Sequence, residues 1–174
     1  MTDRDDIALF TFTLDTDSSV TLRTYSYAGG QDAAGDIIPA GGFDPALAIF
    51  DEDAPQFLIT MDDAMHCDDL NADPVTGLCL DSELADISLP AGTYLVSLTQ
   101  SDHLPVGPTF ADGFSPGTVF GPGEFVDFTG AVRTGNWELD ILGVSSAAEV
   151  PEPGTAALVA AVLVVLFRTR RRPA

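Results

Sequence analysis

Residues 9–27, LFTFTLDTDSSVTLRTYSY, alternate apolar and polar side chains on both sides of a short acidic turn. Alternation with a period of two is the pattern of a β-strand that has one face on a core and the other in water. The stretch therefore predicts two strands, residues 9–14 and 19–27, joined by a turn. The side chains expected on the inward faces are Phe10, Phe12, Leu14, Val20, Leu22 and Thr24.

The chain up to residue 146 repeats this pattern in short segments separated by turn-forming residues. Gly, Pro and Asp cluster between the segments, and no segment keeps the 3.6-residue period of a helix. Short strands with such turns are typical of an antiparallel β-sandwich or jelly roll. We therefore expect one all-β domain over residues 1–146. Its further strands are predicted at residues 46–51, 56–61, 85–89, 93–100, 124–130 and 136–144.

The charge of the chain is strongly acidic and unevenly distributed. Residues 1–150 hold 26 Asp and Glu residues but only three Arg, a net of −23, whereas residues 151–174 hold one Glu and four Arg, a net of +3. Nucleic acids are bound chiefly by Lys and Arg that neutralise phosphates, so nucleic-acid binding is excluded as a function of the body. The C-terminal segment is a different kind of sequence from the body.

The last 25 residues, VPEPGTAALVAAVLVVLFRTRRRPA, divide into three parts. Residues 147–154 form a linker that contains Pro151, Glu152 and Pro153, where two prolines prevent a helix or strand from continuing. Residues 155–167 are uncharged and predict a short transmembrane helix, and residues 168–174 form a basic cytoplasmic tail. A helix of thirteen residues spans about 20 Å, less than the roughly 30 Å hydrocarbon core, so length alone also allows a buried helix or a processing signal. The basic stop that favours the membrane, because arginine side chains reach the headgroups, comprises Arg168, Arg170, Arg171 and Arg172.

This order of motif, apolar segment and arginines resembles the PEP-CTERM sorting signal, which an exosortase recognises in bacteria. The resemblance implies an exported protein that is held transiently in the inner membrane and cleaved near Pro151-Glu152-Pro153. The mature form would lie at the cell surface or outside the cell, often alongside exopolysaccharide. A plain tail anchor is the alternative. The opening MTDRDDIALF lacks the basic and apolar regions of a signal peptide, so we hypothesise that the sequence is truncated at its N-terminus.

The body resembles the bacterial pre-peptidase C-terminal type of β-sandwich. The resemblance lies in FDPALAIFD at residues 43–51, MDD at 61–63 and LPAGTYLVSLTQ at 89–100, in that order. It implies an accessory or surface domain rather than a catalyst. The matching positions are Asp44, Pro45, Asp51, Asp62, Asp63, Gly92 and Tyr94.

Cys67 and Cys79 are the only cysteines and flank an acidic loop. In an exported protein an even count favours a disulfide, which would close a ring of 13 residues and contribute about 3 kcal/mol. A zinc site with His66 is a weaker alternative because no Cys-x-x-Cys spacing is present. Two free thiols would be expected if the protein stayed in the cytosol.

The acidic loop between the cysteines also suggests calcium, because Asp69, Asn71 and Asp73 stand at positions 1, 3 and 5 of an EF-hand-like loop. Pro74 and Leu80 occupy positions where that motif needs Gly and Glu, so an EF-hand is rejected. A looser calcium site remains a hypothesis, and a solvated acidic loop is its alternative. The ligands of this hypothesis are Asp62, Asp63, Asp69, Asn71 and Asp73.

Catalytic motifs find little support. His103 beside Asp102 lacks a Gly-x-Ser-x-Gly elbow, Glu138 and Asp140 share a strand face without further signal, and Trp137 fits a core as well as a sugar platform. Two long connections, residues 62–84 and 101–123, are where binding is expected on a β scaffold. The sequence therefore predicts a non-catalytic cell-surface or matrix protein. The alternative is a carbohydrate-active or peptidase-associated enzyme.

Overall fold

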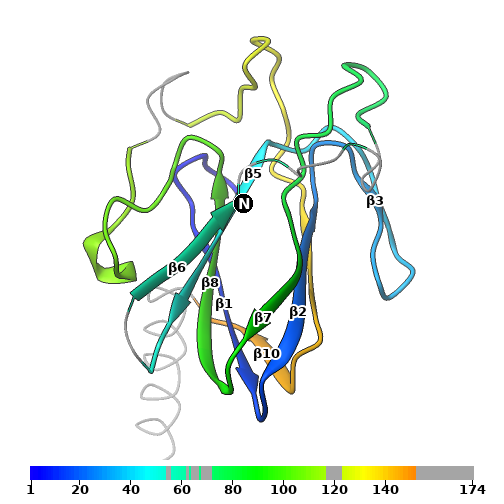
Figure 1. Cartoon of the computed structure of the whole chain (residues 1–174). Coiled ribbons are helices and arrows are strands. Elements are labelled where there is room, and N and C mark those ends of the chain that lie inside the picture. The colour runs from blue at the N-terminus through cyan, green and yellow to red at the C-terminus, as the bar shows by residue number, and fades with distance from the viewer. Residues whose placement is uncertain (54–55, 62, 64–66, 68–71, 117–122, 152–174) are drawn as a thin grey trace, which may run out of the picture.

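The computed structural model describes residues 1–53, 56–61, 63, 67, 72–116 and 123–151 (Figure 1). Ten strands and one short 3-10 turn occur in these residues. Their bounds are β1 Ala8–Leu14, β2 Ser18–Tyr25, β3 Gly30–Gln31, β4 Ile37–Ile38, β5 Pro45–Asp51, β6 Gln56–Met61, β7 Glu83–Leu89, β8 Gly92–Gln100, η1 Phe110–Asp112, β9 Glu138–Leu142 and β10 Ser146–Glu149.

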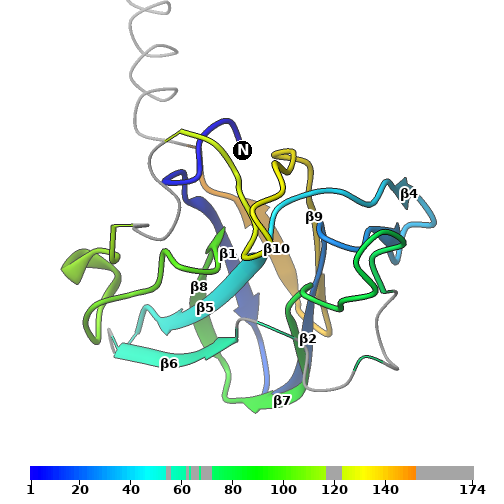
Figure 2. The same cartoon turned by 90° about the horizontal axis from the view of Figure 1, so that it is seen from above.

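The strands form two main antiparallel sheets. One has five strands in the order β10-β1-β8-β5-β6, and the other has three in the order β7-β2-β9, with β3 and β4 as a separate small hairpin. The view from above shows the five-stranded sheet on one side and the three-stranded sheet on the other (Figure 2). The predicted all-β antiparallel fold is therefore confirmed, and its two layers are those of a β-sandwich.

The stretch at residues 9–27 contributes one strand to each sheet. β1 pairs with β8 and β10, whereas β2 pairs with β7 and β9, so the turn at residues 15–17 crosses from one layer to the other. Phe12 of β1 and Val20 of β2 are both almost fully buried and face each other's layer. The predicted inward faces are thus the two inner faces of the sandwich.

The core between the sheets is built from aliphatic side chains and two stacked aromatic pairs. Phe12 stacks on Tyr94 with ring centroids 5.0 Å apart, and Phe43 stacks on Phe125 at 4.8 Å. The Tyr94 hydroxyl donates to the Pro90 carbonyl at 2.9 Å. The buried members of the core are Phe12, Leu14, Val20, Leu22, Phe43, Leu47, Ile49, Leu84, Tyr94, Val96, Leu98 and Phe125.

One predicted strand is wrong. Residues 124–130 form a turn, and their only ladder contact with other described residues is an isolated bridge between Val126 and Val132. The Asp127 side chain accepts from the backbone nitrogens of Thr129 at 2.9 Å and Ala131 at 3.1 Å. An Asp that binds its own backbone in this way stabilises a turn at the expense of a ladder.

The domain boundary expected at residue 146 falls inside an ordered strand. β10 continues the five-stranded sheet to Glu149, and the backbone nitrogen of Val150 donates to the Leu9 carbonyl at 2.8 Å. The first residues of the expected linker therefore belong to the sandwich. Among the residues described, no helix is long and apolar enough to cross a membrane, and the predicted span 155–167 lies outside them.

Candidate functional site

The described part of the second long connection, residues 101–116, folds across the outer face of the five-stranded sheet. Phe110 and Phe114 pack there against Phe50 of β5, with ring centroids 6.0 and 6.5 Å from the Phe50 ring and 5.8 Å from each other. The three rings meet edge to face, the arrangement that aromatic quadrupoles favour. The loop thereby gives this sheet an apolar cluster on the side away from the main core.

The strands supply the floor of this cluster through their alternation. Phe50 of β5 and Leu95 of β8 are cross-strand partners, so their side chains stand on the same face of the sheet. Their chain neighbours Ile49 and Val96 are fully buried in the main core. One sequence signal could have revealed this second covered face: residues 46–50, ALAIF, are apolar without alternation, as expected for a strand buried on both sides.

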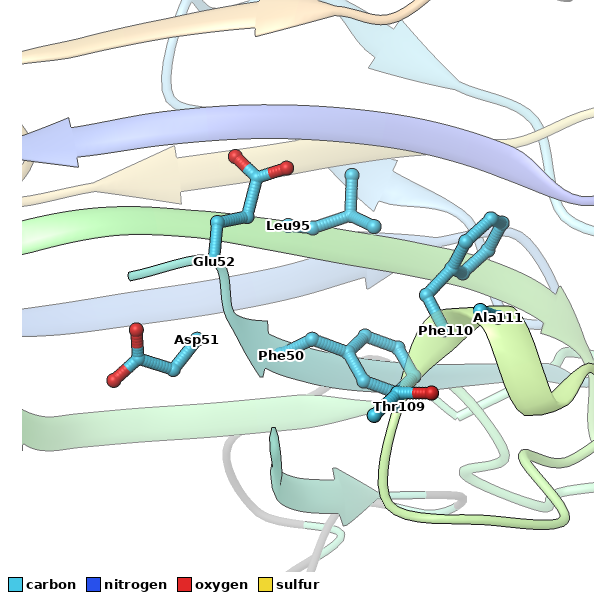
Figure 3. A pocket seen from close by; sticks show the side chains of 7 residues that line it. All are labelled: Phe50, Asp51, Glu52, Leu95, Thr109, Phe110 and Ala111. Atoms are coloured by element: carbon cyan, nitrogen blue, oxygen red, sulfur yellow. The ribbon is translucent and has the colours of Figure 1, made fainter. Parts of the chain in front are cut away.

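A cleft of about 270 Å³ opens between the end of β5 and η1. Figure 3 shows the Phe50 and Leu95 side chains between Phe110 on one side and the carboxylates of Asp51 and Glu52 on the other. Thr109 and Ala111 complete the lining. Ligand pockets commonly start at about 300 Å³, so this cleft has room for one ring-sized group.

The η1 wall of the cleft is fixed by local hydrogen bonds. The backbone nitrogen and hydroxyl of Thr109 both donate to the Asp112 carboxylate, at 2.9 and 2.7 Å, and hold the pKa of Asp112 below its usual value. Gly107 lies so close that an added Cβ would stand 2.6 Å from the Asp112 Cβ. The turn is thus closely packed, and only glycine fits at its start.

The electrostatic character of the cleft is acidic. Both charged residues in its lining, Asp51 and Glu52, are carboxylates, and no described basic residue lines it. An apolar floor with carboxylates and a hydroxyl at the rim suits a neutral or cationic group that has one apolar face and several hydroxyl or amine donors. Anionic ligands are disfavoured because their charge would face Asp51 and Glu52.

The first long connection holds the predicted disulfide, which is confirmed. Cys67 and Cys79 are bonded, with their Cα atoms 5.4 Å apart. Of the predicted calcium ligands, Asp63 is exposed, whereas Asp62, Asp69 and Asn71 lie outside the described residues. No three Asp, Glu, His or Cys side chains of the described part come together as a metal site.

Asp73, the remaining predicted ligand, is buried and already fully hydrogen-bonded. Its Oδ1 accepts from the backbone nitrogens of Val75 and Thr76, at 3.0 and 2.7 Å, and from the Thr76 hydroxyl at 3.0 Å. Its Oδ2 accepts from Arg133 at 3.1 Å. Both oxygens therefore hold the fold in place, which the Asp-x-Asn-x-Asp spacing did not indicate.

Arg133 is the centre of a buried polar cluster that sequence reasoning missed. Its guanidinium donates to Asp127 at 2.7 Å, to Asp73 at 3.1 Å and to the Tyr27 hydroxyl at 2.6 Å. Burial alone would raise the pKa of Asp127, but hydrogen bonds from Thr129 and Arg133 outweigh it and lower that pKa well below its usual range. No sequence pattern connects these residues, because they come from three separate loops.

The other residues considered for chemistry lie away from the cleft lining. Asp102 forms an ion pair with Arg4, and His103 is buried with its ring edge-on to Phe114 at 5.4 Å. Asp140 accepts from the Tyr25 hydroxyl at 2.9 Å. Burial and this bond raise the pKa of Tyr25 to about 12. Glu138 is exposed at the start of β9.

Trp137 and the sorting motif lie near the end of the described chain. Trp137 packs on the core edge-on to Phe10, with ring centroids 5.8 Å apart. Pro151 is exposed. The rest of the motif and the basic stop lie outside the described residues, namely Glu152, Pro153, Arg168, Arg170, Arg171 and Arg172.

The chain was also compared with known proteins. No protein-family model, no curated protein and no solved structure matches it.

Proposed function

We propose that this chain is an exported, non-catalytic β-sandwich protein of the cell surface or extracellular matrix, sorted by an exosortase through its C-terminal segment. The main support for this proposal is the position of the last strand relative to the Pro-Glu-Pro motif. β10, the last strand of the described residues, ends at Glu149, and the Pro-Glu-Pro motif begins two residues later at the exposed Pro151. A cleavage there would release the whole sandwich without removing any strand.

The disulfide supports the export step of this proposal. Disulfides persist in oxidising compartments and are rare in the cytosol. Cys79 is buried and follows a turn whose Asp73 is bound to Arg133, so the covalent link joins an ordered part of the domain. A protein that matures outside the cytosol can rely on such a link.

We further propose that the cleft binds a segment of exopolysaccharide. A sugar ring has an apolar C–H face that fits Phe50, Leu95 and Phe110, and hydroxyls that can donate to Asp51 or Glu52. The acidic rim favours neutral or amino sugars over uronic acids. The ring-sized volume of the cleft predicts contact with one residue of the polymer.

We also propose a calcium site with fewer ligands than the sequence predicted. Because both oxygens of Asp73 are engaged, we propose that a calcium site would use Asp62, Asp63, Asp69 and Asn71 without Asp73. Millimolar calcium should then raise the melting temperature and EDTA should reverse the shift. An unchanged melting curve would remove calcium from the function.

Mass spectrometry of the protein recovered from its native host tests the sorting proposal. We expect a mature C-terminus near Pro151 in the wild type and an uncleaved chain after Pro151→Ala combined with Pro153→Ala. An intact C-terminal RTRRRPA on the surface-located wild-type protein would overturn cleavage. Glycosidase or peptidase activity of the purified chain would favour the alternative of an enzyme.

A further inference from the structure

We infer that, while the C-terminal segment holds the chain in a membrane, the sandwich faces the bilayer with the side formed by the start of β1 and the end of β10, and that Trp137 lies at the lipid headgroups. This inference rests on the proposed function, because it takes residues 155–167 as the anchor. It adds an orientation and a lipid-contacting surface, which the sorting proposal does not contain.

The tether between the sandwich and the anchor is very short. The Val150 backbone is hydrogen-bonded to Leu9, so the chain is fixed to the sheet up to that residue. From Val150 to Thr155 an extended chain covers at most about 17 Å. A strand of nine residues such as β8 is itself about 30 Å long. Since the tether is shorter than the domain, the side around Val150 must lie next to the membrane.

The anchor segment is too short to contribute extra residues to this tether. As a helix, residues 155–167 span about 20 Å, which is less than the roughly 30 Å hydrocarbon core. A span that is too short is accommodated by local thinning of the bilayer and by flanking residues drawn toward the core. Both responses bring Val150 closer to the lipid.

The side around Val150 has the composition of a membrane interface. A cleft of about 120 Å³ there is lined by the apolar side chains of Met1, Ile7, Leu9, Trp137 and Val150. All five are partly exposed, and the view from above shows the N-terminus close to the end of β10 (Figure 2). Tryptophan is enriched at membrane interfaces because its ring is amphipathic.

The charges at the rim of this cleft determine which lipids suit it. Asp6 and Glu149 lie in its lining together with Met1, whose N-terminal ammonium group donates to the Gly135 carbonyl at 3.1 Å, so carboxylates outnumber cations there. Burial would raise the pKa of Asp6, but hydrogen bonds from Thr2 and Asp3 outweigh it and lower that pKa, so Asp6 stays ionised. We therefore expect contact with zwitterionic headgroups, whose cationic groups can approach the carboxylates, and weaker contact with anionic lipids.

Other exposed apolar side chains, on two loops away from Val150, provide the control. Val75, Phe128 and Val132 are 87, 60 and 69 % exposed on the two loops that Arg133 joins. Figure 1 places the loop after residue 123, drawn in yellow, at the upper end of the sandwich and above β10. The short tether favours the side around Val150 over these loop tips.

Fluorescence quenching in zwitterionic vesicles tests the inference, since Trp137 is the only tryptophan of the chain. The full chain is reconstituted into phosphatidylcholine vesicles that carry doxyl-labelled lipids. We expect strong quenching of Trp137 by a label near the headgroup and less by a label at the end of the acyl chain. A chain that floats with the vesicles but shows no quenching overturns the inference alone. A chain that does not float overturns the anchor as well.

A relocated tryptophan provides the matched control. The double variant Trp137→Phe, Phe128→Trp moves the reporter to a loop tip and keeps an aromatic ring at both positions. We expect the quenching to fall at least several-fold while flotation stays unchanged. Equal quenching of the relocated tryptophan would show that the sandwich has no preferred side and would overturn the inference.

Discussion

Arg133 and Asp127, six residues apart in the chain, face each other inside the protein with the Arg133 Nε 2.7 Å from the Asp127 Oδ2. The same guanidinium reaches Asp73 and lies over the Tyr27 ring, 3.9 Å from its centroid. One buried cation thus pairs with two buried carboxylates. Removing one partner of such a group leaves an uncompensated buried charge, which usually costs more than the pair contributes.

Replacing Arg133 by Ala should therefore lower the free energy of unfolding by about 3–5 kcal/mol. Arg133→Lys should recover only part of the loss, because an ammonium group cannot bind two carboxylates and a hydroxyl in the same plane. Urea denaturation monitored through Trp137 measures both. Arg23→Ala, at a partly buried arginine over Tyr25, is the control and should cost much less. Equal losses at the two positions would contradict a special role for the Arg133 cluster.

Asp81 should give the domain an unusual pH dependence. Its buried carboxylate accepts from the backbone nitrogens of Ser26 at 2.6 Å and Ala28 at 2.8 Å, yet burial dominates and raises its pKa to about 6. A carboxyl with a raised folded-state pKa binds its proton more tightly when folded. Its contribution to stability is therefore greatest at low pH and falls as pH rises from about 4 to about 6.

The folded-state pKa of Asp81 is about 6, whereas the ordinary pKa of an Asp is 3.8. This difference corresponds to about 3 kcal/mol in the free energy of unfolding. Asp127 changes stability with pH in the opposite direction. Its lowered pKa gives stability that is lost only when the pH falls below about 4. Urea midpoints should thus be higher at pH 4.5 than at pH 7. Asp81→Asn should flatten this difference and Asp86→Asn, exposed on β7, should not. A wild-type midpoint that rises from pH 4.5 to pH 7 would contradict the prediction.

The disulfide should stabilise the domain by about 3 kcal/mol through its 13-residue ring. The double variant Cys67→Ser, Cys79→Ser and the reduced wild type should lose the same amount. Thermal melts with and without a reducing agent measure it, and thiol titration of the denatured protein should find no free thiol before reduction. If the reducing agent shifted the melting temperature of the serine variant as well, the loss could not be assigned to the disulfide.

The cleft should lose its ligand when its aromatic wall is removed. Phe110→Ala should weaken binding of exopolysaccharide fragments at least tenfold, since the partly exposed Phe110 ring forms one side of the cleft. Leu142→Ala, at an exposed apolar side chain of β9, is the matched control. Isothermal titration calorimetry compares the two. Unchanged affinity in Phe110→Ala would place the sugar elsewhere.

The sandwich could be predicted from the sequence because the residues of its inner faces alternate with polar residues along strands such as β1 and β2. Phe12, Leu14, Val20 and Leu22 alternate with polar residues, and all four lie in the core. β10 carried no such signal, because all four of its residues are exposed at the edge of the sheet. An edge strand with no buried face leaves no period in the sequence.

The cleft and the polar cluster could not be predicted, because they depend on contacts between distant segments. Phe50 and Phe110 stand sixty positions apart and meet only when the loop folds over the outer face of the sheet. The alternation of residues 124–130 predicted a strand because a pattern of apolar residues does not register the hydrogen bonds of Asp127. Local side-chain bonding competed successfully with the ladder there.

The positions of the three body arginines determine how the surface behaves among other molecules. Arg4 is 2 % exposed, the Arg133 side chain is 7 % exposed and Arg23 is partly buried, whereas the body holds 26 acidic residues. Nearly all of the charge that solvent meets is therefore of one sign. Wherever many copies are concentrated, mobile cations must accompany them to keep the volume electrically neutral, and those cations draw in water by osmosis. A crowded layer of this protein should swell in dilute salt and contract as salt screens the charge.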